Sequence, residues 1–306
     1  MSQTGRTAAD THGANGSRRE AKTEFELVTV AMPALNAEAT IADQLAALSA
    51  QTYSGRWELI VSDNGSTDRT QDIVRSWEGR LPYIRIVDSS DGRGVAHARN
   101  VAAAVGGDLI AFCDADDIVS RQWLEELVRT AANGADIAGG ALDHHSLNDP
   151  AIGNARGGST TELQRTYGFL PYAVGGNCAV RRDVFEHLGG WDTSYARAED
   201  VDFSWRAQLA GYKVEFAPGA VIACRHRTTL LGLSRQVYDY ARAEVGLYKQ
   251  YRPVGARRRS LRRTTTSYVY LVTRLPYLVM SRRRRAQWLV PAAENAGRIV
   301  GRWQRR

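Results

Sequence analysis

The sequence predicts an α/β protein with a mostly parallel sheet flanked by helices and a basic helical extension at its C-terminal end. Three observations support this fold class. Short apolar runs alternate with amphipathic stretches from Leu27 onward, which is the order of a sheet with crossover helices. Acidic residues follow two of these runs directly, where such sheets bind ligands. The last fifty residues, finally, are rich in arginine and carry almost no acid.

The first half of the chain alternates regularly. Apolar runs predict strands at 27–32, 57–62, 83–87 and 109–113. Amphipathic stretches predict helices at 40–51, about 68–77 and 94–105; in the first of them Ile41, Leu45 and Leu48 share one face. Strands joined through helices lie parallel in one sheet, so their carboxyl ends should share one edge.

The second half is less regular. A helix is predicted at 121–132 and a strand at 136–142, whereas 143–175 shows no clear periodicity. A loop of that length is uncommon in a compact domain unless it is functional or mobile. Strand and helix character returns at 175–185, a helix follows Glu199 and Asp200, and two short strands are predicted at 213–218 and 220–226.

Composition sets the domain organisation. The polar residues 1–24 cannot offset their ordering entropy and are predicted to be disordered; they also lack the apolar core of a signal peptide. We expect a catalytic domain at 25–228 and an extension at 229–306. Cysteines are few, isolated and odd in number, which indicates reduced core residues of a cytoplasmic protein rather than a disulfide or zinc framework. They are Cys113, Cys178 and Cys224.

An acidic cluster follows the strand at 109–113. Asp114, Asp116 and Asp117 stand within four positions, and carboxylates so concentrated repel one another unless a cation holds them. Mg²⁺ and Mn²⁺ prefer oxygen ligands and are commonly shared with substrate phosphates. The cluster therefore indicates a phosphate-bearing substrate. The alternative is an Asp-rich turn that enters a helix, with Ser120 as the helix cap.

A second acid, Asp63, ends the strand at 57–62. Gly65 permits a tight turn behind it, and Ser66 or Thr67 can cap the next helix. These turn roles account for Gly65, Ser66 and Thr67 without a function. They account less well for Asp63, which should lie at the same edge as the acidic cluster.

The ordered motifs resemble family 2 inverting glycosyltransferases with a GT-A fold. The resemblance covers about residues 25–228. The motifs are PALNAEATI (33–41), VSDNGSTD (61–68), GVAHARN (94–100), CDADD (113–117), GGNCAVRR (175–182), GGWD (189–192), AEDVDFSWR (198–206) and a later His226.

The resemblance implies a nucleotide end of the site. Its residues would be Pro33 and Ala34 in the pocket lining, Asn36 and Glu38 in the adjoining loop, Asp63 as the acceptor of a hydrogen bond from the base, and Arg99 near the diphosphate. For Arg99 a helix-surface arginine is the alternative. Many relatives carry a second acid where this chain has Asn64.

The resemblance also implies a metal and a base. Asp116 would ligate Mg²⁺ or Mn²⁺, Asp114 would lie near the ribose or a metal-bound water, and His226 would complete the metal site, although a lone histidine is often structural. Asp117 could instead cap a helix. Asp200 would deprotonate the acceptor hydroxyl. One base and one metal imply direct displacement, with inversion at the anomeric carbon.

The C-terminal extension has its own chemistry. Residues 257–306 carry fourteen Arg and one Glu, a net of +13 against +7 for the whole chain, so residues 1–256 carry −6. The apolar run between its arginine groups is broken by Arg274 and Pro276 and is too short to span a bilayer. Arginine interleaved with Trp288 and Trp303 suits a helix on an anionic membrane surface. Nucleic-acid binding and a merely solvated tail are the alternatives, and no nucleic-acid motif is present.

The predicted function is transfer of a sugar from a nucleotide-diphosphate sugar to a hydroxyl acceptor. A peripheral position on the inner face of the membrane would place the enzyme beside a lipid-linked acceptor, in cell-envelope polysaccharide or glycolipid synthesis. A nucleotidyltransferase is disfavoured because the first strand is not followed by a Gly- and Lys/Arg-rich loop. A non-catalytic membrane adaptor on a decayed transferase domain is disfavoured by the intact set of site residues.

Overall fold

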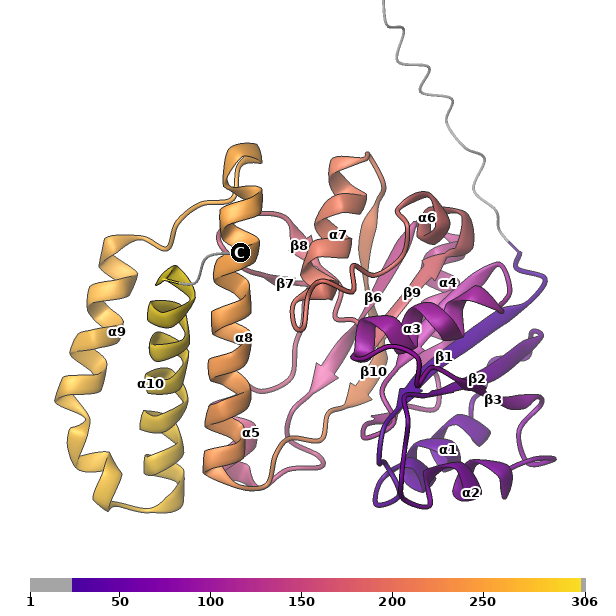
Figure 1. The fold of residues 1–306 in the computed structure, drawn as a ribbon, viewed down its shortest axis with the longest axis horizontal. Coiled ribbons are helices and arrows are strands. Elements are labelled where there is room, and N and C mark those ends of the chain that lie inside the picture. Colours follow the sequence, from indigo (N-terminus) through magenta and orange to yellow (C-terminus); the bar gives the residue numbers. More distant parts are fainter. Residues whose placement is uncertain (1–23, 304–306) are drawn as a thin grey trace, which may run out of the picture.

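The computed structural model describes residues 24–303. The predicted disorder falls on an N-terminal tail that lies, apart from Glu24, outside the described residues. Within them an eight-stranded sheet has the order β3-β2-β1-β4-β9-β6-β10-β5, and β7 pairs with β8 in a small second sheet (Figure 1). The strands are Val28–Ala34 (β1), Trp57–Asp63 (β2), Ile84–Asp88 (β3), Leu109–Cys113 (β4), Ile118–Val119 (β5), Ile137–Asp143 (β6), Gln164–Arg165 (β7), Pro171–Tyr172 (β8), Asn177–Arg181 (β9) and Val214–Ala223 (β10).

The large sheet is mostly parallel, as the sequence predicts. Strands β1 to β4 run parallel, as do β6 and β10, whereas β9 is antiparallel to both β4 and β6. The helices are Ile41–Ser49 (α1), Thr70–Arg75 (α2), Val95–Ala104 (α3), Trp123–Ala132 (α4), Pro150–Ala155 (α5), Arg182–His187 (α6), Glu199–Leu209 (α7), Leu230–Tyr251 (α8), Leu261–Thr273 (α9) and Arg282–Trp303 (α10), with 3₁₀ turns Arg252–Val254 (η1) and Leu275–Val279 (η2).

Helices cover both faces of the sheet because successive strand residues point to opposite sides. In β4, Leu109 and Ala111 belong to the cluster that buries α1 and α4. Ile110 and Phe112 belong to the cluster that buries α3, α6 and α7. A strand covered on both sides is apolar at every position, which is why β4 shows no alternation in the sequence.

Two regions differ from the predicted elements. The pair of strands predicted at 213–226 is one strand, β10, whose pairing with β6 shifts register between Ala217 and Val221. At this irregularity Asn177, fully buried, donates hydrogen bonds to the carbonyl oxygens of Ala141 (2.8 Å) and Ala220 (3.1 Å). The long segment 143–175, predicted as a loop, contains the short elements α5, β7 and β8.

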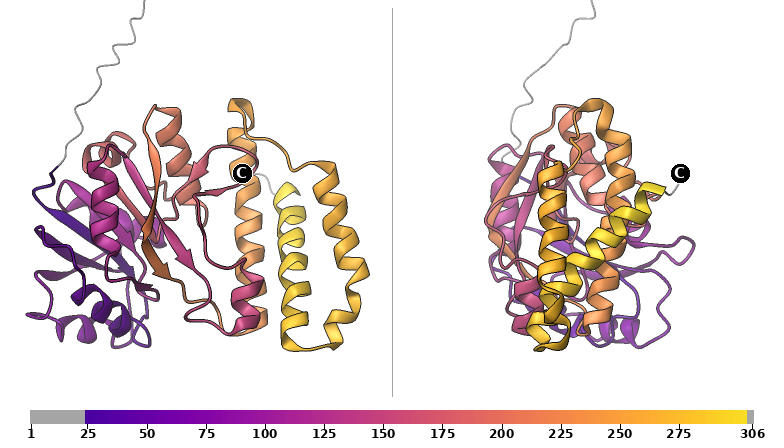
Figure 2. Two further views of the ribbon diagram at one scale, coloured as in Figure 1. Left: turned by 180° about the vertical axis from the view of Figure 1, so that it is seen from behind. Right: turned by 90° about the vertical axis from the view of Figure 1, so that its left-hand side faces the viewer.

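The C-terminal helices stand together at one end of the sheet (Figures 1 and 2). Helix α8 shares a buried cluster with α7 through Leu247, Val201 and Trp205. A second cluster joins Ile152 of α5 to α8 and to Val290 of α10. Residues 229–306 are therefore packed on residues 25–228 through common apolar contacts.

Helix α9 is attached differently, since none of its residues is buried. Pro291 inside α10 has no N–H, so the carbonyl of Gln287 loses its helical donor; the hydroxyl of Tyr270 in α9 donates to that carbonyl at 3.1 Å. The indole of Trp288 donates to the carbonyl of Leu271 at 2.8 Å. Polar contacts thus hold α9 on α10. No helix in the described part of the chain is long and apolar enough to cross a membrane.

Candidate active site

The loops after β1 and β2 are bound to each other at the carboxyl edge of the sheet. Asn36, with a φ of 50°, accepts a hydrogen bond from the Thr67 amide at 2.8 Å. Glu38 accepts one from the Arg69 amide at 3.1 Å. Asn36 and Glu38 therefore fix the loop shape. Pro33 and Ala34 end β1 beside them, and their contact with a nucleotide stays a prediction.

Asp63 ends β2 at the same edge but is only 3% exposed. Its Oδ2 accepts hydrogen bonds from the Gln71 side chain at 2.8 Å and from the Ser66 amide at 3.2 Å. The carboxylate thus stabilises the turn between β2 and α2. Its hydrogen bond to a nucleotide base stays a prediction.

Asn64 has a structural reason to be an amide. Its Nδ2 donates to the carbonyl oxygens of Ser89 (2.5 Å) and Gly92 (2.9 Å), and its Oδ1 accepts from the Gly94 amide at 3.2 Å. A carboxylate has no donor for the two carbonyls. Asn64 therefore holds the loop before α3 against β2 through hydrogen bonds that an aspartate could not make.

The acidic cluster is assembled as predicted from the strand end. Ligand atoms of Asp114, Asp116 and Asp117 all lie within 4.8 Å of one another. Buried Gln44 holds the loop, since its Nε2 donates to the Asp114 carbonyl at 3.0 Å. From the other side the Arg225 amide donates to Asp117 at 2.8 Å. The sequence offered a signal for Gln44, a polar residue on the buried face of α1.

The electrostatics of this cluster fit a divalent cation. Burial raises the pKa of Asp117 well above the ordinary value, and repulsion from Asp114 and Asp116 raises it further; burial and Asp114 also raise the pKa of Asp116. Carboxylates that repel one another when they are ionised form a suitable site for Mg²⁺ or Mn²⁺, because the cation offsets their negative charge. The helix-cap alternative is wrong here, because α4 begins at Trp123 with Gln122 as its cap residue and no side-chain cap.

Asp117→Asn is expected to stabilise the metal-free protein. When folding raises the pKa of an acid, the folded state favours the protonated form. The contribution of that acid to the unfolding free energy is therefore fully present below its unfolded pKa, near 4, and is lost as the pH rises through its folded pKa. At pH 8 the neutral amide should therefore raise the unfolding free energy by roughly 1 kcal/mol, while it can still accept from the Arg225 amide. Differential scanning calorimetry in EDTA measures this.

Melts with Mn²⁺ in place of EDTA test the cation. Mn²⁺ should raise the melting temperature of the unaltered protein, because a ligand that binds only the folded state stabilises it. Asp116→Asn should remove that increase, and Glu215→Asn, at an exposed position of β10, should retain it. An equal Mn²⁺ effect in the Asp116 variant would contradict the site.

His226 lies beside the cluster but is not a member of it among the described residues. Its Nε2 is 3.0 Å from Nδ1 of His144. Burial lowers the pKa of His226 to about 3 and that of His144 to about 4. Both rings are neutral at pH 7, the form that ligates metals. His226 as a metal ligand stays a prediction, and it requires the ring to leave His144.

Arg99 connects the two acidic regions of the site. It is 3% exposed, so the helix-surface alternative is wrong. One end of its guanidinium bonds Asp114 at 2.7 Å and the other bonds Glu199 at 2.9 Å. Burial alone would lower the pKa of Arg99, but these carboxylates raise it above its ordinary value. Its contact with a diphosphate stays a prediction.

Asp200 and Glu199 open helix α7. The preceding residue, Ala198, has a φ of 70°, a left-handed conformation that is unfavourable for alanine. Asp200 is partly exposed and accepts hydrogen bonds from the amides of Gly175 (3.1 Å) and Val201 (2.8 Å). Burial raises the pKa of Asp200. Burial and the charge of Asp200 raise the pKa of Glu199 to about 7.

Two glycines let these groups meet. A Cβ at Gly175 would lie 2.5 Å from Nη1 of Arg99, and a Cβ at Gly176 would overlap the Asp114 carboxylate. The GGN turn thus approaches Arg99, Asp114 and Asp200 with its backbone. The structure brings these residues together with Asp116 and Asp117, whereas Asp63, Asn36 and Glu38 lie in neighbouring loops.

The mostly parallel sheet, with this order of strands and with acidic residues at its carboxyl edge, is a GT-A fold. The model of the family described as "Glycosyl transferase family 2" matches residues 29–189. The chain belongs to that family.

Similar proteins support the same class. The glycosyltransferase AglE of Haloferax volcanii is 29% identical over 89% of this chain and 95% of its own length. The UDP-Glc:α-D-GlcNAc-diphosphoundecaprenol β-1,3-glucosyltransferase WfgD of Escherichia coli is 39% identical over 32% of this chain and 38% of its own length. The mannosyltransferase PcManGT of Pyrobaculum calidifontis, solved in complex with GDP-Man and Mn²⁺, has the same fold, with a TM-score of 0.64 and 19% identity over 92% of this chain and 88% of that chain.

Proposed function

We propose that the protein transfers a sugar from a nucleotide-diphosphate sugar to a hydroxyl acceptor, with a divalent cation and with inversion of the anomeric centre. The observation that carries this is the placement of the two acidic regions. Arg99 bridges Asp114 of the acidic cluster and Glu199, the neighbour of Asp200. A leaving phosphate at one region and an attacking hydroxyl at the other would therefore face a single reacting carbon.

In this proposal Asp200 is the general base. Its carboxylate is held by two backbone amides, so its orientation is fixed before the acceptor binds. Burial raises the pKa of Asp200, which makes the carboxylate a stronger base than an exposed aspartate. Glu199 is bound to Arg99 and less exposed, so it is the less suitable of the pair.

The cation would be held by Asp116 with Asp114 and Asp117, and by His226 if its ring turns away from His144. Bound Mg²⁺ or Mn²⁺ would neutralise charge on the leaving diphosphate. Arg99 would share this role as a fixed positive group beside Asp114. The Pyrobaculum enzyme was solved with Mn²⁺, which supports a cation of this kind.

The acceptor is proposed to be a lipid-linked glycan of the cell envelope. The name of the E. coli relative gives a diphosphoundecaprenol acceptor and a UDP-glucose donor for that protein. The Pyrobaculum enzyme was solved with GDP-Man, another nucleotide sugar. Only the chemical classes of donor and acceptor are proposed for this chain, because the sequence identity to the Pyrobaculum enzyme is low and the match to the E. coli relative covers a part of the chain.

A panel of nucleotide sugars tests the reaction. We expect one donor to bind in the presence of Mn²⁺ and to bind at least about tenfold more weakly in EDTA or in Asp116→Ala, because the cation contributes to diphosphate binding. With an α-linked donor, proton NMR of the first product should show a β linkage. A retained α linkage would exclude direct displacement.

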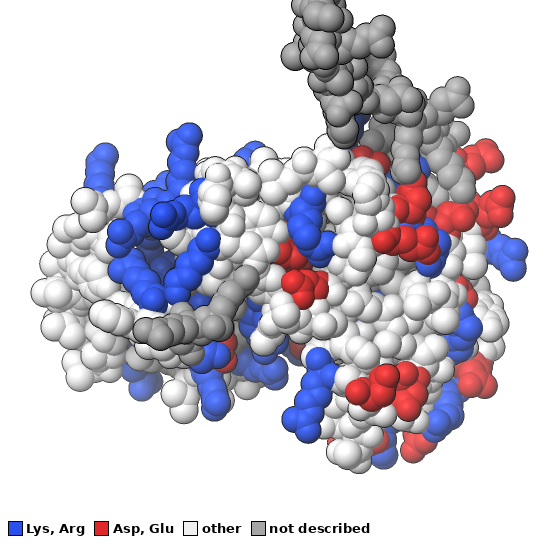
Figure 3. Space-filling view, turned by 45° about the horizontal axis from the view of Figure 1, so that its top comes forward, with Lys and Arg blue, Asp and Glu red and all other residues white. Residues whose placement is uncertain are grey.

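The C-terminal helices are proposed to bind the cytoplasmic face of the membrane. Figure 3 shows Lys and Arg gathered over these helices, whereas most Asp and Glu lie over the sheet. Helix α9 and η2 expose an apolar stripe, and arginines stand at both ends of it. The stripe consists of Leu261 (82% exposed), Tyr268, Val272 (67%), Leu275 and Val279 (89%). Apolar residues flanked by positive charge match an anionic lipid surface.

Flotation with vesicles of anionic lipid measures this binding. Val272→Asp/Val279→Asp is expected to lower the floated fraction several-fold, because two charges enter the apolar stripe. The matched control Val105→Asp/Leu209→Asp, at exposed apolar positions of the catalytic domain, should float like the unaltered protein. Equal flotation of both double variants, or retention of the protein on RNA instead of vesicles, would contradict the membrane proposal.

A further inference from the structure

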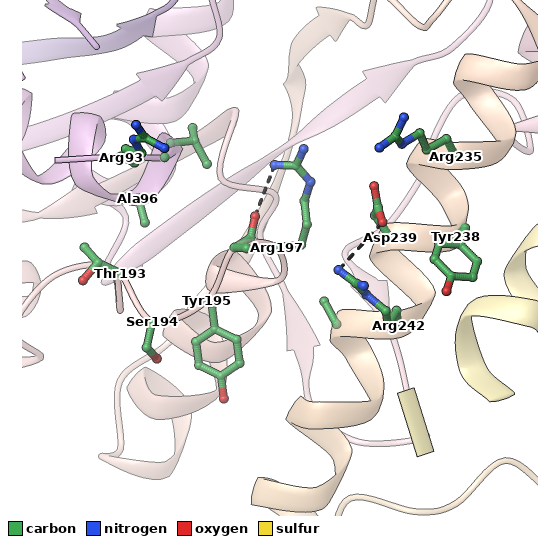
Figure 4. A pocket seen from close by; sticks show the side chains of 14 residues that line it. Arg93, Ala96, Thr193, Ser194, Tyr195, Arg197, Arg235, Tyr238, Asp239 and Arg242 are labelled. Carbon is green, nitrogen blue, oxygen red and sulfur yellow. Dashed lines mark hydrogen bonds and ion pairs between the residues drawn. The ribbon is translucent and has the colours of Figure 1, made fainter. Parts of the chain in front are cut away.

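A pocket of about 740 Å³ lies between the catalytic domain and the C-terminal helices, outside the acidic site. Its walls are the start of α3, the loop at 193–197 before α7, and one face of α8. Figure 4 shows Arg197, in the loop before α7, and Arg235 and Arg242, on α8, directed toward the same space. Four of them are arginines: Arg93, Arg197, Arg235 and Arg242.

The pocket is strongly positive. Among the described residues that line it, Asp239 is the one acid, and it pairs with Arg242 at 4.0 Å. The other three arginines come from three separate segments, so no helical repeat explains why they line one pocket. Arginine presents a planar fork of donors that matches phosphate oxygens. The positive end of α3, which starts at Gly94 without a side-chain cap, adds to the same potential.

Aromatic rings hold two of these arginines. The Arg197 guanidinium lies 5.7 Å from the ring centre of Tyr240, and that of Arg242 lies 6.0 Å from the ring centre of Tyr238. Such contacts limit the rotamers of an arginine that is otherwise exposed. The lining also includes Tyr195, whose ring can contact a sugar or an isoprenoid. The pocket thus combines charge with apolar surface.

The pocket adjoins the candidate site through two elements. Ala96 in its wall is three residues before Arg99 on α3, and Arg197 is three residues before Asp200. It is therefore on the side of Asp200, the acceptor end. A donor diphosphate has its own place at the acidic cluster with the cation.

We propose that this pocket binds the phosphate or diphosphate that joins the acceptor sugar to its carrier. The inference rests on the proposed function, because it assigns the acceptor end of that site. An anionic group held by Arg197 and Arg242 would orient the acceptor sugar toward Asp200. The carrier can be a lipid or a soluble group, since both present the same phosphate chemistry.

Calorimetric titration without metal isolates the pocket. The probes are farnesyl diphosphate, farnesol and inorganic pyrophosphate, each in EDTA, with the full chain. We expect farnesyl diphosphate to bind, and Arg197→Gln and Arg242→Gln each to weaken it by about tenfold, the usual cost of a lost charge-assisted hydrogen bond. Asp239→Asn should strengthen binding by roughly threefold, because it removes the acid that competes for Arg242.

Two controls separate this site from the donor site. Arg56→Gln, an exposed arginine in the loop before β2, and Asp116→Ala should leave the affinity for farnesyl diphosphate unchanged. Binding equal to that of farnesol, or an affinity that depends on Asp116 and not on the pocket arginines, would overturn the proposal. Tighter binding of farnesyl diphosphate than of pyrophosphate would support a lipid carrier, and equal affinities for the two probes would support a soluble phosphate. Asp200→Asn should bind the probe normally, so loss of transfer and loss of this site are distinguishable.

Discussion

Asp200→Asn is expected to lower kcat by about 10²- to 10⁴-fold, the usual contribution of a positioned general base. The amide has nearly the same shape and can still accept one of the backbone hydrogen bonds from Gly175 and Val201, but it cannot take a proton from the acceptor. Donor affinity should be unchanged, because the acidic cluster is intact. Steady-state kinetics with donor titration measure both quantities, and Glu215→Gln provides a surface control.

The pH dependence has a definite sign. A base acts in its deprotonated form, so kcat/KM should fall as the pH decreases. Burial raises the pKa of Asp200 above its ordinary value of 3.8, so kcat/KM should fall at a higher pH than it would with an exposed aspartate as the base. Full turnover in Asp200→Asn would exclude this base.

Arg99→Gln is expected to lower the unfolding free energy by about 3–5 kcal/mol, the cost of removing one partner of a buried ion pair. Arg99 is bonded to both Asp114 and Glu199. Its loss leaves two carboxylates at a site that already contains Asp116, Asp117 and Asp200. Urea denaturation measures the change.

A surface pair gives the matched comparison. Arg69 is paired with Glu38 at 3.4 Å and its side chain is 79% exposed, so Arg69→Gln should cost at most about 1 kcal/mol. Arg99→Gln/Glu199→Gln should recover part of the lost stability, because the second change removes one unpaired charge. A loss below about 1 kcal/mol in Arg99→Gln would show that solvent, not Arg99, compensates these acids.

The sheet and the acidic cluster could be predicted because both are local in sequence. Strand β4 is a continuous apolar run, and α1 places Ile41, Leu45 and Leu48 on one buried face. Asp114, Asp116 and Asp117 are neighbours in the chain, so one turn brings them together. The 143–175 segment was not predictable, since α5, β7 and β8 are too short to show a period.

Groups whose partners are distant could not be predicted. Arg99 has the sequence context of a surface arginine, and its partners are 15 and 100 residues away. The two strands predicted at 213–226 form one strand, β10. Pro218 and Gly219 interrupt its pairing with β6, and Asn177 donates a hydrogen bond to the Ala220 carbonyl at this irregularity. The convergence of arginines in the pocket likewise depends on how α8 packs.

The polar attachment of α9 gives this helix an independent opening equilibrium. Its contacts with α10 include the hydrogen bonds of Tyr270 and Trp288, and no apolar side chain of α9 must leave a core when it detaches. Its amide protons should therefore exchange with solvent through a local opening long before the sheet unfolds. Contact with a lipid surface would slow that exchange in 261–279 alone. Hydrogen exchange would then report membrane attachment and the state of the catalytic domain as separate signals.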